Sequence, residues 1–597
     1  MRWAVGWSGS GSQSSNGFDR SGRGDGALGP AQRLDALERL ATERFDVLVI
    51  GGGVTGSGCA LDAASRGLNV GLIEQRDLAS GTSSRSSKLI HGGLRYLEQL
   101  DLGLVAEALR ERSLMLHTVA PHLVRPVPFL YPLQHRVWER AYVGAGIALY
   151  DLLARRGTNP LPRHRHLSWR SAQAQAPGVA ADRLVGAVKF WDAQVDDARH
   201  TMFVARTAAA HGAAIASSVR ARGLVMTDGR VSGVQVRCGE TGRELVIEAR
   251  VVVNATASWT DQIQAMAGQP DPRVRAQPDL RVRASKGVHL VVHRDRIPGD
   301  VGLITRTSSS VLFVIPWGER WLIGTTDTDW DLDLAHPAAS RTDIDYLLAE
   351  ANRWLADPLG PEDVIGVYAG LRPLLEGESD DTSSLTRKHA VHSSAPGMVT
   401  VAGGKYTTYR VMAADAIDAA TAEAGIRVGA SVTSALPLLG APGLGAFRDQ
   451  VAGLAVRHGL GVAQIERLAG RYGTLTPEVL DLVTQNPDLG RPVTDDTPYL
   501  GAELVYGARC EGALHLDDLL TRRTRISVES AGRGADVAPH VASLVAGELG
   551  WDRSAVRREV DHYRARVDAE LVSQTMATDR SADAARLDAR DVRVLDA

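Results

Sequence analysis

Gly51, Gly53 and Gly56 give the chain its clearest chemical signal, because their spacing matches the pattern G-x-G-x-x-G. They follow an apolar stretch and precede a segment of small residues, as in a strand that turns into a helix. In this pattern the first glycine permits a tight turn, the second lets backbone approach a pyrophosphate, and the third lets the helix pack closely. Glu74 ends the next apolar stretch, where its carboxylate would bond an adenosine ribose and repel a 2′-phosphate. The spacing predicts a bound dinucleotide other than NADP, and it does not separate FAD from NAD.

Several cations stand beside glycine, proline and apolar residues. The stretch SSKLIHGGLRYLEQL holds Lys88, His91 and Arg95 next to a glycine pair. Arg372 in GLRPL and Arg387 in LTRKH have similar neighbours. A single arginine usually lies on the solvated surface, whereas arginines in this setting can face a bound anion. Arginine suits a phosphate because its planar guanidinium can bond two oxygens at once.

The segments around these residues predict an α/β chain with a helical end. Residues 32–42 predict a short amphipathic helix, and residues 44–74 predict a βαβ unit. The middle of the chain is α/β with a substantial antiparallel part, and after about residue 428 the pattern becomes helical and alanine-rich. Residues 1–43 are expected to form a disordered extension with the lead-in helix. Residues 44–428 are expected to form the cofactor-binding domain, in the end an FAD-binding domain, with an interleaved substrate-binding domain. A helical domain is expected at 429–574 and a polar tail at 575–597.

Composition bounds the classes of function. The 597 residues have a net charge of −3, so bulk charge gives no reason to expect a nucleic acid partner. Three widely spaced cysteines form neither a metal box nor a disulfide framework, and no metal site is expected. We expect a cytoplasmic protein, because the N-terminal segment lacks a secretory signal and no apolar run approaches the roughly 18 residues of a membrane span.

A series of motifs resembles the family of FAD-dependent glycerol-3-phosphate dehydrogenases, the aerobic enzymes linked to quinone. In chain order the motifs are DLASGTSSRSSKLIHGGLRYLEQ, VDDARHTMFVA, KGVHLVV, VIPWGERWLIGTTDTD, AGLRPLL, SLTRKHAV and VAGGKYTTYRVMA, spanning about residues 44–425. LDDLLTRRTRI, in the helical end, resembles the family's final signature. The resemblance implies a Rossmann-like FAD-binding domain, an antiparallel-sheet substrate domain like that of glycine oxidase and D-amino-acid oxidase, and a helical C-terminal domain. It also implies oxidation of sn-glycerol 3-phosphate to dihydroxyacetone phosphate, with hydride passing to the N5 atom of FAD and electrons then to a membrane quinone.

The resemblance assigns roles to individual residues. The substrate is expected to contact Arg95, Tyr96, Arg372 and Arg387. The stretch GGKYTT is expected to open a helix whose N-terminus faces the flavin, where negative charge develops on reduction. Beyond the glycine loop and Glu74, the residues expected at FAD are Thr82, Ser83, Ser87, Lys88, His91, Gly92, Thr256, Gly403, Gly404 and Lys405.

The catalytic residues are expected to be His289, Arg372 and Lys405. His289 is the first choice for the base that removes the hydroxyl proton, because histidine titrates near working pH. His91 is the other candidate, and it could instead orient the flavin. Lys405 could act electrostatically near the pyrimidine end of the flavin.

One motif departs from the family pattern. The usual N-A-T-G-P-W is replaced by Asn254-Ala255-Thr256-Ala257-Ser258-Trp259. The glycine expected at Ala257 would let backbone approach the adenosine side of FAD, and alanine adds one methyl group there. We expect FAD to fit slightly differently at this position and its binding site to be retained.

A quinone acceptor requires contact with a membrane. Between residues 135 and 170 the chain is rich in arginine and also contains Trp138, Tyr142 and an apolar run. Basic flanks with aromatic residues and an apolar face are typical of binding to an anionic lipid surface. The alternative is a core helix with solvated ends. The first interpretation places the protein on the inner face of the cell membrane, and a homodimer is one alternative for its oligomeric state.

Three other functions remain open from the sequence. A glycerol-3-phosphate oxidase would pass electrons to oxygen, and residue chemistry alone does not decide between these acceptors. An amine or amino-acid flavin oxidase of the same fold needs one carboxylate clamp, which is less than this set of cations provides. A non-catalytic flavin-binding protein is disfavoured by the intact Arg95, Arg372 and Lys405.

Overall fold

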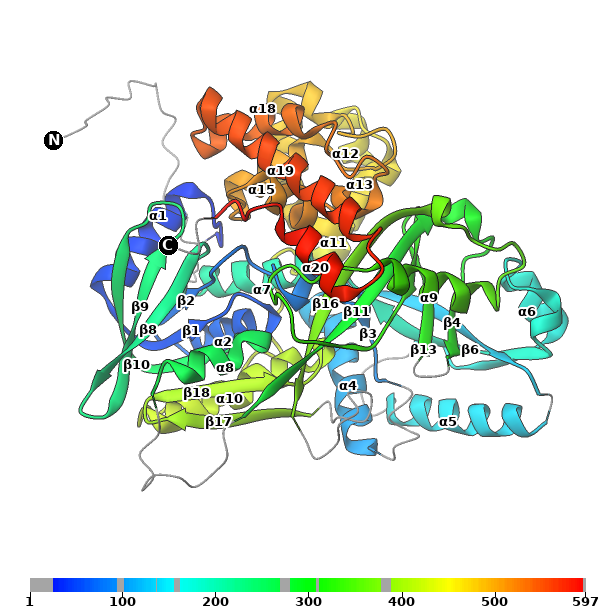
Figure 1. Ribbon diagram of the computed structural model, residues 1–597, viewed down its shortest axis with the longest axis horizontal. Helices are drawn as coiled ribbons and strands as arrows, with labels where there is room; N and C mark the ends of the chain where they lie inside the picture. Colours follow the sequence, from blue (N-terminus) through cyan, green and yellow to red (C-terminus); the bar gives the residue numbers. More distant parts are fainter. Residues whose placement is uncertain are drawn as a thin grey trace.

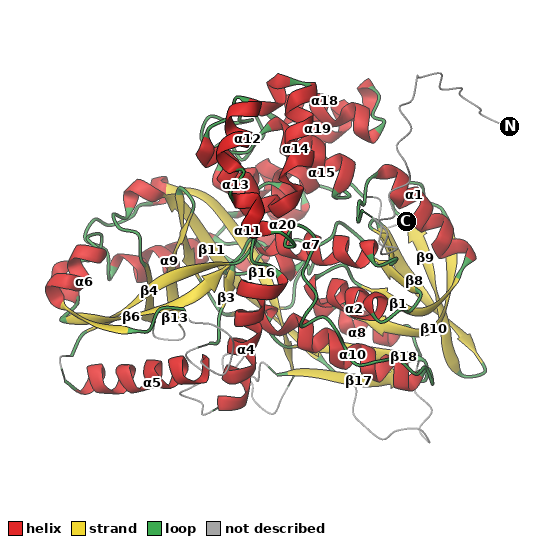
Figure 2. Ribbon diagram, turned by 180° about the vertical axis from the view of Figure 1, so that it is seen from behind, coloured by secondary structure: helices red, strands yellow, loops and turns green. Residues whose placement is uncertain are grey.

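The computed structural model describes residues 25–93, 101–135, 137–154, 161–268, 280–307, 311–376 and 388–593. Two sheets lie side by side, and a domain of helices covers the region where they meet (Figures 1 and 2). The predicted α/β fold with an antiparallel substrate domain and a helical C-terminal domain is confirmed. The expected N-terminal extension lies largely outside the described residues, which begin just before helix α1 (Pro30–Thr42).

The first sheet contains the predicted βαβ unit. Strands β1 and β2 are parallel, and their apolar side chains are buried, as expected for a parallel sheet covered on both faces. One face packs against α2 (Val54–Ser65), α7 (Asp197–Ala210) and α10 (Tyr409–Glu423), and the other against α1 and a hairpin. The strands in spatial order are β17 (His389–Ala395), β18 (Met398–Gly403), β10 (Glu244–Asn254), β1 (Arg44–Ile50), β2 (Val70–Ile73) and β7 (Ala214–Ala216), with β8 (Val219–Thr227) and β9 (Arg230–Cys238) forming the hairpin beside β10.

The second sheet is mainly antiparallel. Its longest pair is β11 (Val282–His293) and β16 (Val364–Leu375), which sets Ser285 opposite Arg372 and His289 opposite Tyr368. The other strands are β3 (Leu89–Ile90), β4 (Arg125–Leu133), β5 (Arg165–Ser168), β6 (Gly186–Gln194), β12 (Gly302–Arg306), β13 (Val311–Trp317), β14 (Arg320–Gly324) and β15 (Thr328–Trp330). Helices α4 (Leu102–Leu114), α5 (Trp138–Ala154), α6 (Trp169–Gln175) and α9 (Arg341–Asn352) lie around it, and α8 (Thr260–Ala265) lies at the first sheet.

The helical domain docks onto the first sheet through buried ion pairs. Asp77, which follows β2, accepts hydrogen bonds from Arg522 at 2.5 Å and from Arg523 at 2.7 Å. All three side chains are buried, so each charge depends on the other domain for compensation. The helices are α11 (Leu444–Arg448), α12 (Val451–His458), α13 (Val462–Tyr472), α14 (Thr476–Gln485), α15 (Gly501–Cys510), α16 (Leu516–Asp518), α17 (Ile526–Glu529), α18 (Ala538–Leu549), α19 (Arg553–Ser573) and α20 (Asp579–Leu587).

The end of the chain differs from the expected polar tail, because residues 579–587 form α20 and pack against the molecule. Ala582, Asp583 and Arg586 are buried. Asp579 lies 2.5 Å from the ammonium of Lys286, a fully buried residue of β11. The sequence of this helix is polar because its inward face is largely charged and pairs with distant residues.

Candidate active site

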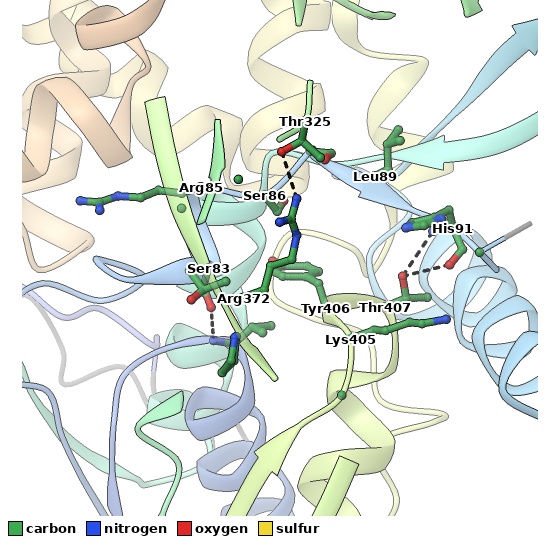
Figure 3. A pocket seen from close by; sticks show the side chains of 18 of the residues that line it. Ser83, Arg85, Ser86, Leu89, His91, Thr325, Arg372, Lys405, Tyr406 and Thr407 are labelled. Carbon is green, nitrogen blue, oxygen red and sulfur yellow. Dashed lines mark hydrogen bonds between the residues drawn. The ribbon is translucent and has the colours of Figure 1, made fainter. Parts of the chain in front are cut away.

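A cavity of about 310 Å³ lies between the two sheets (Figure 3). Its walls include the first residues of α2, the segment 82–91, strands β11 and β16, and the segment that follows β18. The loops come from the carboxyl ends of parallel strands, which is where open α/β sheets bind ligands. Phe129, Phe190 and Phe313 make part of the wall apolar, and the sequence analysis did not single them out.

The glycine loop has the geometry that a pyrophosphate requires. Gly51 has a φ of 113°, and a Cβ at Gly56 would lie 1.9 Å from the Gly51 carbonyl oxygen. Gly53 precedes the first residue of α2, and a Cβ there would lie 3.2 Å from the Ser83 hydroxyl. The Val54 N–H donates to that hydroxyl at 2.9 Å. A bare backbone cradle at a helix N-terminus fits the phosphates of a dinucleotide.

Glu74 lies beside this cradle. Its carboxylate accepts hydrogen bonds from the backbone N–H of Gly52 at 2.7 Å and of Arg76 at 2.9 Å. Burial raises the pKa of Glu74, while these two N–H groups favour its charged form. The carboxylate therefore braces the loop, and its expected bond to a ribose stays a prediction.

The segment 82–87 joins the cofactor side of the cavity to the substrate side. The Thr82 hydroxyl donates to the Leu371 carbonyl oxygen at 2.6 Å, on β16. The Ser87 hydroxyl lies 2.8 Å from Nε2 of His289, on β11. Thr82, Ser83 and Ser87 all line the cavity, as expected of residues that wrap a flavin.

Lys88 is placed differently from the prediction that it faces the flavin. Its ammonium lies 2.8 Å from the Asp197 carboxylate and 3.2 Å from the Ser84 carbonyl oxygen, and it is not among the residues lining the cavity. The physical reason is burial, since a lysine 2% exposed needs a carboxylate partner. Asp197, at the start of α7, supplies that partner.

Arg372 enters the cavity from β16 (Figure 3). Its guanidinium donates to the Thr325 hydroxyl and to the Thr326 carbonyl oxygen, both at 3.0 Å. The Asp327 carboxylate lies 3.3 Å away. Gly287 makes room for this arginine, because a Cβ there would lie 2.5 Å from Nη2. Asp327 and Arg306 also line the cavity, and neither was predicted from the sequence as a site residue.

His289 lies on the wall next to Arg372 and is 2% exposed. Its ring stacks on Tyr368 with a centroid distance of 4.8 Å and an interplanar angle of 7°. Burial lowers the pKa of His289 well below 6.5, and the nearby charges of Arg372 and Lys88 lower it further. The ring is therefore neutral at neutral pH, which is the form that accepts a proton.

The expected helix after GGKYTT is present, because β18 ends at Gly403 and a turn at 406–408 leads into α10. Gly403 and Gly404 have φ values of 73° and 78°, and both line the cavity with Lys405. Figure 3 shows Lys405 and Thr407 on the same side as His91. The backbone N–H of His91 donates to the Thr407 hydroxyl at 3.2 Å.

Two further predicted positions hold the backbone near the cavity. The Gly92 N–H donates to the Tyr150 hydroxyl at 2.7 Å, so α5 is tied to this wall. The Thr256 hydroxyl donates to Asn254 at 2.7 Å and does not line the cavity. Ala257 does line it and has a φ of 52°, a conformation that suits the glycine expected there.

Three predicted substrate residues, Arg95, Tyr96 and Arg387, lie outside the described residues. Their contact with the substrate stays a prediction. Among the described residues, Arg372, His289 and Lys405 give the cavity polar groups, and Val54 and Thr55 bring the N-terminus of α2 to its wall.

Comparison with known proteins gives a consistent result. The FAD dependent oxidoreductase family matches residues 46–410, and a family described as the C-terminal domain of alpha-glycerophosphate oxidase matches residues 431–556. Glycerol-3-phosphate dehydrogenase 2 of Mycobacterium tuberculosis is 56% identical over 567 residues, covering 95% of this chain and 95% of that protein. The mitochondrial glycerol-3-phosphate dehydrogenase of Homo sapiens is 37% identical over 561 residues, covering 90% of this chain and 75% of that protein.

Among solved structures, the glycerol-3-phosphate dehydrogenase of Bacillus halodurans complexed with FAD has a TM-score of 0.74 at 28% identity. The match covers 91% of this chain and 98% of that chain. The similarity therefore extends over the two sheets and the helical domain together.

Proposed function

Because the chain belongs to the family of FAD-dependent glycerol-3-phosphate dehydrogenases, we propose that it oxidises sn-glycerol 3-phosphate to dihydroxyacetone phosphate and passes the electrons to a membrane quinone. The observation that supports the reaction most directly is Arg372 beside the buried, neutral His289 in one cavity with the N-terminus of α2, which follows the glycine loop. The quinone acceptor rests on the family resemblance and on an exposed apolar helix face.

FAD fits the residues present. The glycine loop and the N-terminus of α2 would hold its pyrophosphate, while Gly403, Gly404 and Lys405 would lie near its ring system. When bound, FAD supplies the two-electron acceptor for the hydride of the substrate carbinol. The chain contributes orientation, charge and proton transfer.

Arg372 is proposed to bind the substrate phosphate. One terminal nitrogen of its guanidinium donates to oxygens of Thr325 and Thr326, and the other makes longer contacts with neutral oxygens of β11. These neutral partners fix its orientation without cancelling its charge. Asp327 compensates part of that charge before substrate arrives. A phosphate dianion would gain the larger part of its attraction from this pre-oriented fork.

His289 is proposed to accept the hydroxyl proton. The Ser87 hydroxyl and the Tyr368 ring hold the imidazole in place, so no reorientation is needed. The positive charge of Arg372 lowers the pKa of His289 in the free protein. A bound phosphate would offset that charge and make the imidazole more basic when the proton must move.

Helix α5 is proposed to contact anionic lipid. Trp138 and Leu152 are 62% and 60% exposed, while Ile147 and Tyr150 on the other face are buried. Figure 1 shows α5 at the edge of the molecule, away from the helical domain. Exposed aromatic and apolar side chains on one helix favour an interfacial position. Among the described residues, no helix is long and apolar enough to cross a bilayer.

The reaction is tested by adding sn-glycerol 3-phosphate to the purified holoenzyme without oxygen. Bleaching of the flavin absorbance is expected, with no change on adding glycerol or glycine. Persistent oxidised flavin would refute the proposed reaction. The acceptor is then tested by comparing reoxidation by a quinone analogue with reoxidation by oxygen, and faster reoxidation by oxygen would favour the oxidase alternative.

Membrane contact is tested by sedimentation with anionic vesicles at low salt. The wild type is expected in the pellet, and Trp138→Ser with Leu152→Ser is expected to move it to the supernatant. Val456→Ser is the control, because Val456 is 86% exposed on α12 of the helical domain. Equal pelleting of all the variants would exclude α5 as the contact.

A further inference from the structure

A second cavity, of about 70 Å³, lies where the segment 82–87 meets the helical domain. Its wall includes Arg85 from the segment after β2, Thr521 and Arg566 from the helical domain, and Gln574 and Arg586 near the chain end. Arg85 also borders the large cavity, and Figure 3 shows its side chain pointing away from that cavity's centre. Arginine side chains from three separate segments therefore converge on one small chamber.

The chamber has more positive than negative charge. Among its described lining residues, five are arginine or lysine and one, Glu570, is acidic. Lys88 and Arg525 are paired with Asp197 at 2.8 and 2.5 Å, and Arg566 lies 2.5 Å from Glu570. The two remaining cations are Arg85 and Arg586.

Neither of these two arginines has a close carboxylate of its own. Arg586 lies 3.6 Å from Glu570, which Arg566 already engages more closely. Arg85 donates to the Ala335 carbonyl oxygen at 3.3 Å. No carboxylate oxygen of a described residue lies within 4.0 Å of its guanidinium nitrogens, the distance that defines an ion pair. Burial and the neighbouring cations, Arg522 and Arg586, lower the pKa of Arg85 to about 10, although the carboxylates of Glu570 and Asp517 oppose part of that shift. Both side chains remain charged at neutral pH.

Arg586 is 5% exposed, and Arg85 is partly buried. A buried cation without a close carboxylate is costly, and a second cation nearby adds repulsion. Ordered water could solvate the chamber, but water would leave the two charges uncompensated. A tetrahedral anion can accept two hydrogen bonds from each guanidinium fork and can also accept from the Gln574 amide. The volume suits a small inorganic oxyanion rather than an organic phosphate ester.

We infer that this chamber binds a small oxyanion of the phosphate or sulfate class between Arg85 and Arg586. The anion would join the segment 82–87 to α20. That segment bonds to His289 through Ser87, and α20 bonds to Lys286 on the same strand through Asp579. The site therefore stabilises the substrate side of the large cavity from behind and takes no part in the reaction.

Thermal unfolding of the holoenzyme tests the site with sodium phosphate at constant ionic strength. The Tm of the wild type is expected to rise with phosphate concentration, because a ligand that binds only the folded state stabilises it. Arg586→Gln is expected to reduce that rise at least threefold. Arg580→Gln is the matched control, since it removes an exposed charge from the same helix and should leave the rise unchanged. An equal rise in all three proteins would assign the effect to the substrate site and overturn the inference.

A direct measurement does not depend on the folding of a variant. Crystals of the wild-type holoenzyme soaked in sodium selenate are expected to give an anomalous peak within hydrogen-bonding distance of both Arg85 and Arg586. Water density at that position, with selenate bound at other sites, would refute the inference. Neither experiment depends on turnover. A negative result for the anion site can therefore be distinguished from a negative result for the proposed reaction.

Discussion

The two sides of the large cavity are built by different means. The cofactor side depends on backbone, because Gly51 and Gly56 allow contacts that a single Cβ would prevent. The proposed substrate side depends on side-chain chemistry, through the charged Arg372 and the neutral His289 on neighbouring strands. Substitutions on the first side should act through assembly of the holoenzyme, and substitutions on the second should act through rate and pH dependence.

Gly56→Ala should have the largest effect. The added Cβ would lie 1.9 Å from the Gly51 carbonyl oxygen, so the start of α2 must move away from the loop. We expect a loss of about 3 kcal/mol of stability and little bound FAD. Flavin absorbance per protein and thermal unfolding measure this.

Gly53→Ala is the control for the glycine loop. Its Cβ would lie 3.2 Å from the Ser83 hydroxyl, which can rotate away. This variant should fold and bind FAD more weakly. If Gly56→Ala retained full FAD, the proposed backbone cradle would be incorrect.

His289→Asn should lower kcat by about 100-fold or more, the usual contribution of a general base, while FAD content stays unchanged. In the wild type the depressed pKa of His289 implies that kcat/KM is level from about pH 6.5 to about pH 8 and falls only in more acid solution, as the base becomes protonated. An acid limb centred above pH 6.5 would contradict this assignment, as would full activity of the variant.

His289 should also contribute to the pH dependence of stability. Its folded pKa is depressed, so at pH below 6.5 the unfolded chain binds a proton that the folded chain excludes. Stability is thus lost as pH falls through 6.5 toward the folded value. Denaturant unfolding at about pH 7 and about pH 5 should show a smaller acid loss in His289→Asn than in wild type. An unchanged acid loss would mean that other groups dominate.

Arg372→Lys should reduce kcat/KM for sn-glycerol 3-phosphate by about 10- to 100-fold, because a single ammonium replaces the bidentate fork. The flavin spectrum and FAD content should not change. The specific control is reoxidation of chemically reduced enzyme by a quinone analogue, a half-reaction that does not involve the substrate phosphate and should have the same rate in both proteins. An equal loss in both half-reactions would assign Arg372 a structural role instead of phosphate binding.

Ala257→Gly should have the smallest effect. Ala257 has a φ of 52°, which costs an L-residue about 1 kcal/mol relative to glycine. The gain is partly offset because glycine has more freedom in the unfolded chain. We expect a change in stability of less than about 1 kcal/mol and slightly tighter FAD binding, measured by thermal unfolding and flavin release. Weaker FAD binding would show that the methyl group makes a favourable contact.

The glycine loop was easier to predict from the sequence than the contacts between distant segments, for a physical reason. A glycine loop depends on residues a few positions apart, so its spacing carries most of the geometry. Lys88 was misplaced because its buried ammonium is paired with Asp197, and nothing local to Lys88 indicates so distant a partner. Asp327 was missed for the same reason, since it lies between β14 and β15 and meets Arg372 only when β15 and β16 both pair with β11.

The prediction for the last helix, α20, failed for a similar reason. A polar sequence usually indicates solvent exposure, but α20 buries Asp583 and Arg586. Periodicity of apolar residues does not detect a helix whose inward face is charged. The overall fold was predictable because both sheets and the helical domain have ordinary apolar patterns and a family resemblance over most of the chain.

The bond between Asp579 and Lys286 has a consequence for biosynthesis. Lys286 is fully buried on the strand that bears His289, and its second carboxylate partner belongs to the last helix of the described chain. At about 5–20 residues per second, tens of seconds separate the synthesis of these two residues on the ribosome. During that interval the strand holds Lys286 with Asp343 alone. Strand β11 therefore reaches its final ion pairing only after α20 has been synthesised, so a chain that ends before α20 would leave Lys286 without this second carboxylate.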